Sequence, residues 1–95
     1  MKDLINIRED DLPEELHKFD NKDVRVIFFG NVNGRIKLNH IKTKVENFEV
    51  FITSKTTKDN LIFDLCDIYN IQRSVKDSRK LYLHLESIGA VAIVG

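Results

Sequence analysis

The sequence predicts a mainly β (α+β) fold: a small barrel or a curled antiparallel sheet of five to six strands with one N-terminal helix. Eleven Ile and eight Val against two Ala make the chain rich in β-branched residues and poor in the best helix former. Asn33-Gly34, flanked by apolar runs, is typical of a β-hairpin turn. Residues 80–86 alternate apolar and polar side chains, which indicates a half-buried strand.

Length and composition predict one folded unit over residues 1–95. With 42% hydrophobic and 32% charged residues, the chain has enough apolar surface to fold without a partner. Cys66 is the single cysteine, and we expect a small buried thiol in a reducing compartment. Charges interrupt residues 1–8 before a signal peptide could form, and no apolar run is long enough to span a bilayer. We therefore expect a cytoplasmic protein without membrane association.

A short helix is predicted near the N-terminus, over residues 11–19. Asp11 resembles an N-cap, with Pro13 in the first turn and Glu14 placed to complete a capping box. One apolar stripe follows at helical spacing: Leu12, Leu16 and Phe19. We expect this stripe to pack on a sheet.

The hairpin is predicted from strands at 23–32 and 35–43. With Asn33-Gly34 as a two-residue loop, Phe29 lies opposite Leu38 and Asn31 opposite Ile36. One face is then apolar: Ile27, Phe29, Ile36 and Leu38. The other combines Val24, Val26, Phe28 and Val32 with Arg35, Lys37 and Asn39. The first strand should thus be buried on both sides, as in a curled sheet or small barrel.

Four further strands are predicted. Residues 45–53 alternate, and residues 80–86 alternate without a fault. Residues 61–71 fit a helical face almost as well as a strand, and we favour a strand because their residue types are mediocre helix formers. Residues 90–94 form a continuous apolar strand, which must be covered on both faces or paired at an interface.

An alternative fold makes 58–71 and 77–88 a pair of helices. In that interpretation residues 85–91 resemble the end of a winged-helix recognition helix and its following strand. The alternation at 81–85 argues against a helix there.

The order of elements, a short helix followed by five or so strands, resembles the Sm-like and SH3-like small barrels. This resemblance implies a small β-barrel, and some of these barrels bind RNA. The nearest match to the base-binding loop of the Sm-like family is residues 43–47, Thr-Lys-Val-Glu-Asn, which lacks the family's acid. The family's Arg-Gly motif is absent, so no RNA-binding residue is carried over from the resemblance.

The charges are segregated although the net charge is zero. Residues 1–20 carry a net charge of −4, and residues 21–44 carry +5. A basic surface for nucleic acid or an acidic partner could combine Arg25, Arg35, Lys37, Lys42, Lys44, Arg73 and Arg79. A pI near 6.8 is low for a protein that binds phosphate backbones, which favours solvated, mutually neutralising charges instead.

The residues that could support catalysis or metal binding are scattered. His17, His40 and His84 belong to three different elements, so we expect no metal and no cofactor. Asp64 and Asp67 flank Cys66, but no nucleophile elbow or phosphate loop accompanies them. We therefore expect no enzyme; a catalyst using Asp64, Asp67, His40 or His84 is the third hypothesis. Tyr69 and Tyr82 could stack on bases or anchor a partner.

The function predicted from these observations is a non-catalytic binding module. Protein–protein interaction or self-assembly comes first, in a small regulatory or inhibitory role. The predicted oligomer edge is the apolar strand Ala90, Val91, Ala92, Ile93 and Val94. The alternative is single-stranded nucleic acid bound by the basic hairpin.

Overall fold

The computed structural model describes residues 3–57, 59–77 and 79–95, and they form a mainly β fold, as predicted. In chain order the described elements are β1 (Leu4–Asn6), the 3-10 turn η1 (Glu9–Asp11), α1 (Leu12–His17), β2 (Val24–Phe29), β3 (Gly34–Leu38), β4 (Ile41–Glu46), β5 (Glu49–Ser54), β6 (Asn60–Asp64), the 3-10 turn η2 (Leu65–Asp67), β7 (Ile68–Ser74), β8 (Lys80–Leu85) and β9 (Gly89–Val94).

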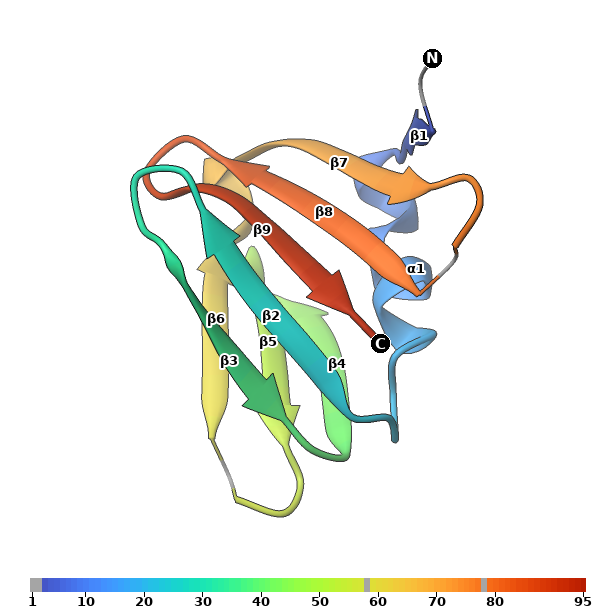
Figure 1. Ribbon diagram of the computed structural model, residues 1–95. Helices are drawn as coiled ribbons and strands as arrows, with labels where there is room; N and C mark the ends of the chain where they lie inside the picture. The colour runs from blue at the N-terminus through green and yellow to red at the C-terminus, as the bar shows by residue number, and fades with distance from the viewer. Residues whose placement is uncertain (1–2, 58, 78) are drawn as a thin grey trace.

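The strands form two antiparallel sheets, one in front of the other in Figure 1. The large sheet has the strand order β1-β7-β8-β9-β2-β3, and the small sheet has the order β4-β5-β6. Both sheets are open, so the small barrel, one of the two predicted forms of the fold, is wrong. A six-stranded antiparallel sheet accompanied by one helix agrees with the other form of the prediction.

The hydrophobic core lies between the two sheets and against α1. Fully buried side chains come from every layer: Leu12 and Leu16 from α1, Val26, Leu83, Val91 and Ile93 from the large sheet, and Ile41, Val50 and Ile52 from the small sheet. Alternate residues of each strand point into this core, because side chains alternate between the faces of a strand. The other half of the side chains forms two outer faces, one on each sheet.

The helix α1 has the predicted apolar stripe but a different start. Leu12, Leu16 and Phe19 are all buried, as expected. The capping box is wrong: the side chain of Asp11 caps no backbone N–H, because Asp11 already lies in the 3-10 turn η1 with φ −92° and ψ −4°. No helix in the described part of the chain has the length and apolar character needed to cross a membrane.

The hairpin of β2 and β3 exists, but its predicted register is wrong. Leu38 lies opposite Val24 instead of Phe29, so β3 is shifted by five residues along β2 relative to the prediction. Because side chains alternate between the two faces of a strand, a shift by an odd number of residues places each face of β3 beside the opposite face of β2 from the one predicted. The loop is longer than two residues because the Asn33 side chain accepts from the N–H of Gly30 and donates to its carbonyl. Ile27 and Phe29 therefore share a face with Arg35 and Lys37.

Two segments predicted as single strands each divide between the sheets. The 35–43 segment breaks at His40, which has a φ of 50° and donates its N–H to the Asp23 carboxylate, so β3 and β4 belong to different sheets. The 61–71 segment breaks at η2, where the Asp64 side chain accepts the N–H of Cys66. Both halves of 61–71 are strands, and so is β8, which makes the winged-helix alternative wrong.

The remaining strand predictions hold with shifted boundaries. The 45–53 prediction spans the end of β4, a turn with positive φ at Asn47 and Phe48, and β5. The strands predicted at 80–86 and 90–94 correspond to β8 and β9. However, β9 lies between β8 and β2, so both of its backbone edges are already paired within the chain. The prediction that this strand offers a free edge is wrong.

Candidate functional site

The outer face of the large sheet carries a row of cations. Strand pairing places Lys37 beside Arg25, Arg25 beside Val94, and Val94 beside Lys80, across β3, β2, β9 and β8. Arg35 lies on the same face, two residues from Lys37 on β3. Four cationic side chains thus project from neighbouring positions of one sheet surface.

These four cations have no partner carboxylate among the described residues. Other cations do: Arg8, Lys18, Lys44, Arg73, Lys76 and Arg79 each form an ion pair. Arg25 and Lys37 are directly opposite each other, an arrangement of like charges that destabilises a sheet. The chain therefore neutralises many of its cations but leaves those of this row unpaired.

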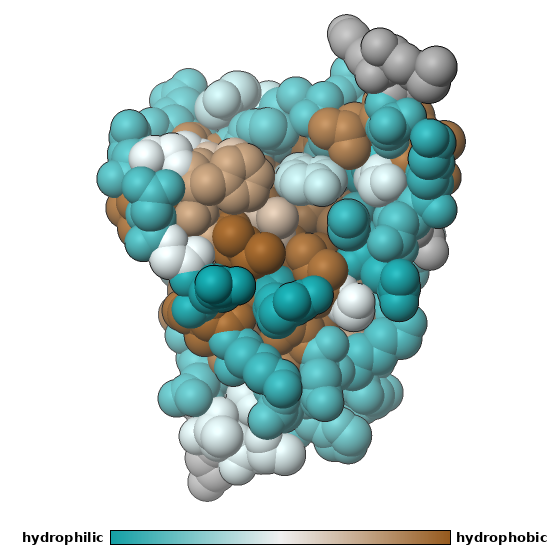
Figure 2. Space-filling view, in the orientation of Figure 1, coloured by the Kyte–Doolittle hydropathy of each residue, from teal (hydrophilic) through white to brown (hydrophobic). Residues whose placement is uncertain are grey.

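One carboxylate lies at the edge of this face: Asp23, directly before β2, lines a hollow together with Arg25 and Lys37. Within the strands of the large sheet, the outward positions contain no Asp or Glu among the described residues. Beside the four cations they are apolar, aromatic or neutral polar: Ile27, Phe29, Ala90, Ala92, Val94, Tyr82, His84, Asn70, Gln72, Ser74, Leu4 and Asn6. Figure 2 shows this face as an apolar band across the middle of the sheet, bordered by hydrophilic side chains. The surface is thus positive and partly apolar, although the whole chain is neutral.

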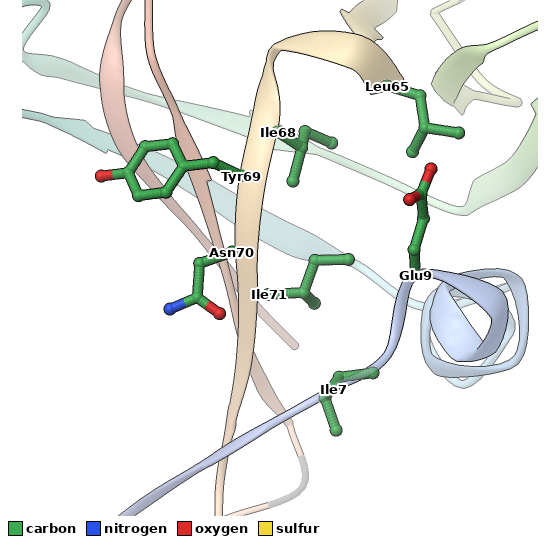
Figure 3. Close-up of a pocket in the computed structure, with 7 residues that line it drawn as sticks. All are labelled: Ile7, Glu9, Leu65, Ile68, Tyr69, Asn70 and Ile71. Atoms are coloured by element: carbon green, nitrogen blue, oxygen red, sulfur yellow. The ribbon is translucent and has the colours of Figure 1, made fainter.

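Aromatic rings accompany the cations on this outer face. Phe29 is 42% exposed, and Tyr82 lies half-buried in the centre of the sheet. A bulge in β7 turns Tyr69 and Asn70 away from the core side chains of Ile68 and Ile71 (Figure 3). The Tyr69 ring lies 6.1 Å from the ring of His84, measured between centroids. Both tyrosines of the chain therefore belong to this surface.

A chain of polar side chains crosses the same face. The Nε2 atom of His84 lies 2.8 Å from Oε1 of Gln72, and Nε2 of Gln72 donates to Oδ1 of Asn6 at 3.1 Å. These contacts link β8, β7 and β1 and hold the His84 ring in place beside Tyr69. The hydrogen bonds thereby fix the side-chain orientations of His84, Gln72 and Asn6 on the uncharged part of this face.

Only part of the predicted basic surface is brought together. Arg25, Arg35 and Lys37 share the outer face of the large sheet, but Lys42 and Lys44 point outward from the small sheet. Arg73 points to the inner side of β7 and donates to Glu15 of α1 at 3.3 Å. Arg79 pairs with Asp77 at 3.1 Å, and this hydrogen bond lowers the pKa of Asp77. Arg73 and Arg79 are thus not part of the large-sheet surface.

Asp64 and Asp67, the acidic residues of the catalytic hypothesis, accept backbone hydrogen bonds at turns. Asp64 caps η2, and Asp67 accepts the backbone N–H of Ser87 at 3.2 Å. Cys66 between them is exposed, so the expectation of a buried thiol is wrong. His40 lies at the turn between β3 and β4 and His84 on the large sheet, in different parts of the fold.

The third histidine, His17, belongs to a partly buried structural network, in which Thr43 is the buried member. His17 Nδ1 lies 2.8 Å from Oδ2 of Asp20, while Oδ1 of Asp20 accepts both the backbone N–H and the hydroxyl of Thr43, each at 2.8 Å. Burial alone would raise the pKa of Asp20, but the hydrogen bonds from Thr43 and His17 outweigh it and lower the pKa. This network fastens the end of α1 to β4.

Two residues of the outer face were missed by sequence reasoning. Phe29 was assigned to the other face of the hairpin, and Lys80, at the start of the strand predicted at 80–86, was not included in the basic surface. The signal that locates Phe29 is the alternation within β2: Val24 and Val26 are buried, so Phe29 shares its face with Arg25. Lys80 follows from its pairing with Val94 at the start of β8.

No protein-family model, curated protein or solved structure matches this chain.

Proposed function

We propose that the chain is a non-catalytic binding module that holds single-stranded nucleic acid on the outer face of its large sheet. The observation that supports this function is the row of unpaired cations, Lys37, Arg25 and Lys80, on a surface that also presents Phe29 and Tyr82. Cationic side chains that follow a backbone and aromatic rings that stack on bases are the two parts of such a site.

Phosphate binding accounts for the opposed cations. Arg25 and Lys37 repel each other across β2 and β3, and neither forms an ion pair with a described carboxylate. Asp23, which lines the hollow beside them, carries one negative charge against their two positive charges. A phosphate placed between the two side chains accepts hydrogen bonds from both, and charge-assisted bonds of this kind are stronger than neutral ones. The nucleic acid thus removes a cost that the free sheet carries.

Base stacking accounts for the aromatic side chains and for the single strand. Phe29 and Tyr82 lie on a sheet surface, whereas the bases of a duplex are stacked on one another and cannot reach a flat protein face. Unpaired bases can be turned outward and stacked on such rings. Two aromatic rings on the same sheet face as four cations therefore favour single-stranded over double-stranded nucleic acid.

A pI near 6.8 is compatible with this function because the described carboxylates lie outside the outward strand positions of the large sheet, with Asp23 at the edge of this face. Their absence from the described outward positions of the large sheet keeps the local potential positive. Binding would then depend on this one surface instead of the overall charge.

The test is fluorescence anisotropy with labelled single strands of about ten nucleotides, a length in the range of small binding domains. For four phosphate contacts, log affinity should fall with log salt at a slope of about −3. Arg25→Ala combined with Lys37→Ala should reduce the affinity and make the slope shallower by about 1.4, because each lost phosphate contact removes about 0.7.

The matched control is Lys42→Ala, which removes an unpaired exposed cation from the outer face of the small sheet. Its affinity should stay within about twofold of the unmodified protein, since it removes no phosphate contact. A flat salt response, or equal losses in the control and the double variant, would exclude this site. Saturable binding of an acidic peptide without binding of oligonucleotides would assign the surface to a protein partner instead.

We also propose that the protein acts in the cytoplasm, and this location and the absence of catalysis have separate support. The Asp64 and Asp67 side chains are engaged in backbone hydrogen bonds at turns, which is a structural role. Cys66 is an exposed free thiol, and such a thiol persists in a reducing compartment. A regulatory role in which the protein binds and sequesters single-stranded nucleic acid requires no catalytic group.

A further inference from the structure

The outer face of the small sheet has charges of opposite sign at its two ends. Three rows of directly opposed residues cross the strands β4, β5 and β6. The first row is Lys42, Thr53 and Asn60, the second is Lys44, Phe51 and Ile62, and the third is Glu46, Glu49 and Asp64. The face is thus basic at one end and acidic at the other, and its middle row combines Lys44 with the apolar side chains of Phe51 and Ile62.

The acidic end carries uncompensated charge. Glu49 lies directly opposite both Glu46 and Asp64, and opposed like charges destabilise a sheet. Lys44 pairs with Glu46 at 2.9 Å, whereas neither Glu49 nor Asp64 forms an ion pair with a described residue. Two exposed carboxylates therefore lack a cation within the described chain.

A groove lies at the basic end of the small sheet's outer face. Lys42, Lys44 and Lys55 line a groove of about 440 Å³ together with Phe51, Thr53 and Asn60. Lys55 donates to the side-chain oxygen of Asn21, and Lys42 forms no ion pair with a described residue. The groove is thus suited to anionic side chains entering from outside.

The middle row supplies the apolar contact. Ile62 is 49% exposed and lies opposite the half-buried Phe51, whose ring has the Lys44 ammonium 5.0 Å from its centroid. Ile62 and Phe51 would gain burial if another apolar surface covered them.

We infer that two copies of this chain associate through the outer faces of their small sheets, around a two-fold axis that lies in the interface. The axis crosses the middle row between β4 and β5 and is inclined to that row, so that the end of β4 in one copy lies over the opposite end of β5 in the other. A half-turn about this axis brings the basic end of each copy over the acidic end of the other. Lys42 then meets Glu49 of the second copy, and the same contact forms a second time, as isologous symmetry requires. Ile62 and Phe51 cover their symmetry mates in the middle.

The size of the face predicts a weak dimer. Three rows across three strands are far fewer residues than the roughly 20–30 per partner of a stable interface. Association should therefore depend on protein concentration, and raising the salt should weaken it because the charge contacts are exposed. The large-sheet outer faces stay uncovered, so this inference is independent of the proposed function.

Sedimentation velocity over a wide concentration range, without nucleic acid, tests the inference with two charge reversals. The unmodified protein should move from the 11.1-kDa monomer toward twice that mass as its concentration rises. Lys42→Glu and Glu49→Lys should each stay monomeric, because each variant places like charges opposite one another in both contacts. A mixture of the two variants should dimerise again, because each Lys42→Glu chain then faces a Glu49→Lys chain with opposite charges.

Native mass spectrometry of that mixture, with one variant isotopically labelled, should show the heterodimer in excess over either homodimer. Circular dichroism should show both variants folded, since the two positions are exposed on the sheet surface. A monomeric mass at every concentration of the unmodified protein would overturn the inference. The inference would also be overturned if Lys42→Glu and Glu49→Lys each still formed the dimer, or if the mixture of the two variants stayed monomeric. Weaker oligonucleotide binding by Lys42→Glu in a protein that never dimerises would assign the groove to nucleic acid.

Discussion

Gly30 and Gly89 pack backbone to backbone, so closely that a Cβ atom on either one would lie 2.9 Å from the Cα atom of the other. Gly30 lies in the loop between β2 and β3, and Gly89 begins β9. Their φ angles are 141° and 94°, values that favour glycine. This contact holds one end of the large sheet together.

Replacing either glycine with alanine should destabilise the fold. The added methyl group must displace backbone atoms, and the backbone conformation is strained for any other residue, so a loss of about 1–3 kcal/mol is expected. Urea unfolding of Gly30→Ala and Gly89→Ala measures the loss. Val32→Ala, at an exposed position of the same loop, is the control and should change stability by less than about 0.5 kcal/mol. Unchanged unfolding midpoints for both glycine variants would contradict this prediction.

Asp20→Asn should destabilise the protein by about 1–3 kcal/mol at neutral pH. The asparagine amide oxygen is a weaker acceptor than a carboxylate for the buried Thr43 hydroxyl and backbone N–H. The NH₂ group of the amide also replaces the carboxylate oxygen beside His17. Asp10→Asn is the control, because the side chain of Asp10 is 85% exposed and its ion pair with Arg8 lies on the surface. Equal stability of the two variants would show that the network contributes nothing.

The effect of Asp20 should also depend on pH. Its pKa in the folded protein is lowered from the ordinary value of 3.8, so its stabilisation is complete well above pH 3.8. The stabilisation is lost as the pH falls from 3.8 through the lower pKa of the folded state. The stability difference between the unmodified protein and Asp20→Asn should therefore shrink in acid. A difference that grows below pH 3.8 would mean that the folded-state pKa is raised instead.

Arg73→Ala should reduce stability without weakening oligonucleotide binding. The Arg73 and Glu15 side chains are only 27% and 12% exposed, and their ion pair joins β7 to α1. Its loss should cost about 1–2 kcal/mol, since Lys18 also neutralises Glu15. Arg8→Ala removes an exposed ion pair and should leave the unfolding midpoint unchanged. Reduced oligonucleotide affinity in a folded Arg73→Ala protein would place Arg73 in the binding surface after all.

Tyr82→Leu should lower the affinity for single strands about tenfold, because one base loses its aromatic partner while the side chain keeps its apolar bulk. Tyr82→Phe retains the ring and should retain most of the affinity. Phe51→Leu makes a matched change on the outer face of the small sheet and should have no effect. Anisotropy titrations at one fixed salt concentration compare the three variants. A Tyr82→Phe loss as large as that of Tyr82→Leu would point to the hydroxyl group instead of stacking.

Local sequence signals predicted elements better than they predicted connections. The alternation at 80–86 and the stripe Leu12, Leu16 and Phe19 are confirmed, since each depends only on one segment facing one core. The break at His40 depends on Asp23, which accepts the His40 N–H from a distant position in the chain. A continuous β-rich run contains no signal for such a contact, so two sheets were not foreseen.

The binding surface was only partly predictable for the same reason. Arg25, Arg35 and Lys37 follow from the charge pattern of one hairpin. The inward turn of Arg73 depends on Glu15 of α1, and the position of Phe29 depends on the register that the Gly30 loop imposes. Charge in a sequence identifies candidate cations, but tertiary pairing decides which of them remain unpaired.

The central position of β9 also determines the order in which the large sheet can assemble. β2 and β3 can pair early as a hairpin, and β7 and β8 can pair with each other, but β9 joins these two parts. Val26 must wait for Ile93, a residue far along the chain, before its backbone pairing is complete. Such distant pairings slow folding. During synthesis, the apolar residues of β2 therefore remain without the second of their two neighbouring strands until residues 89–94 leave the ribosome.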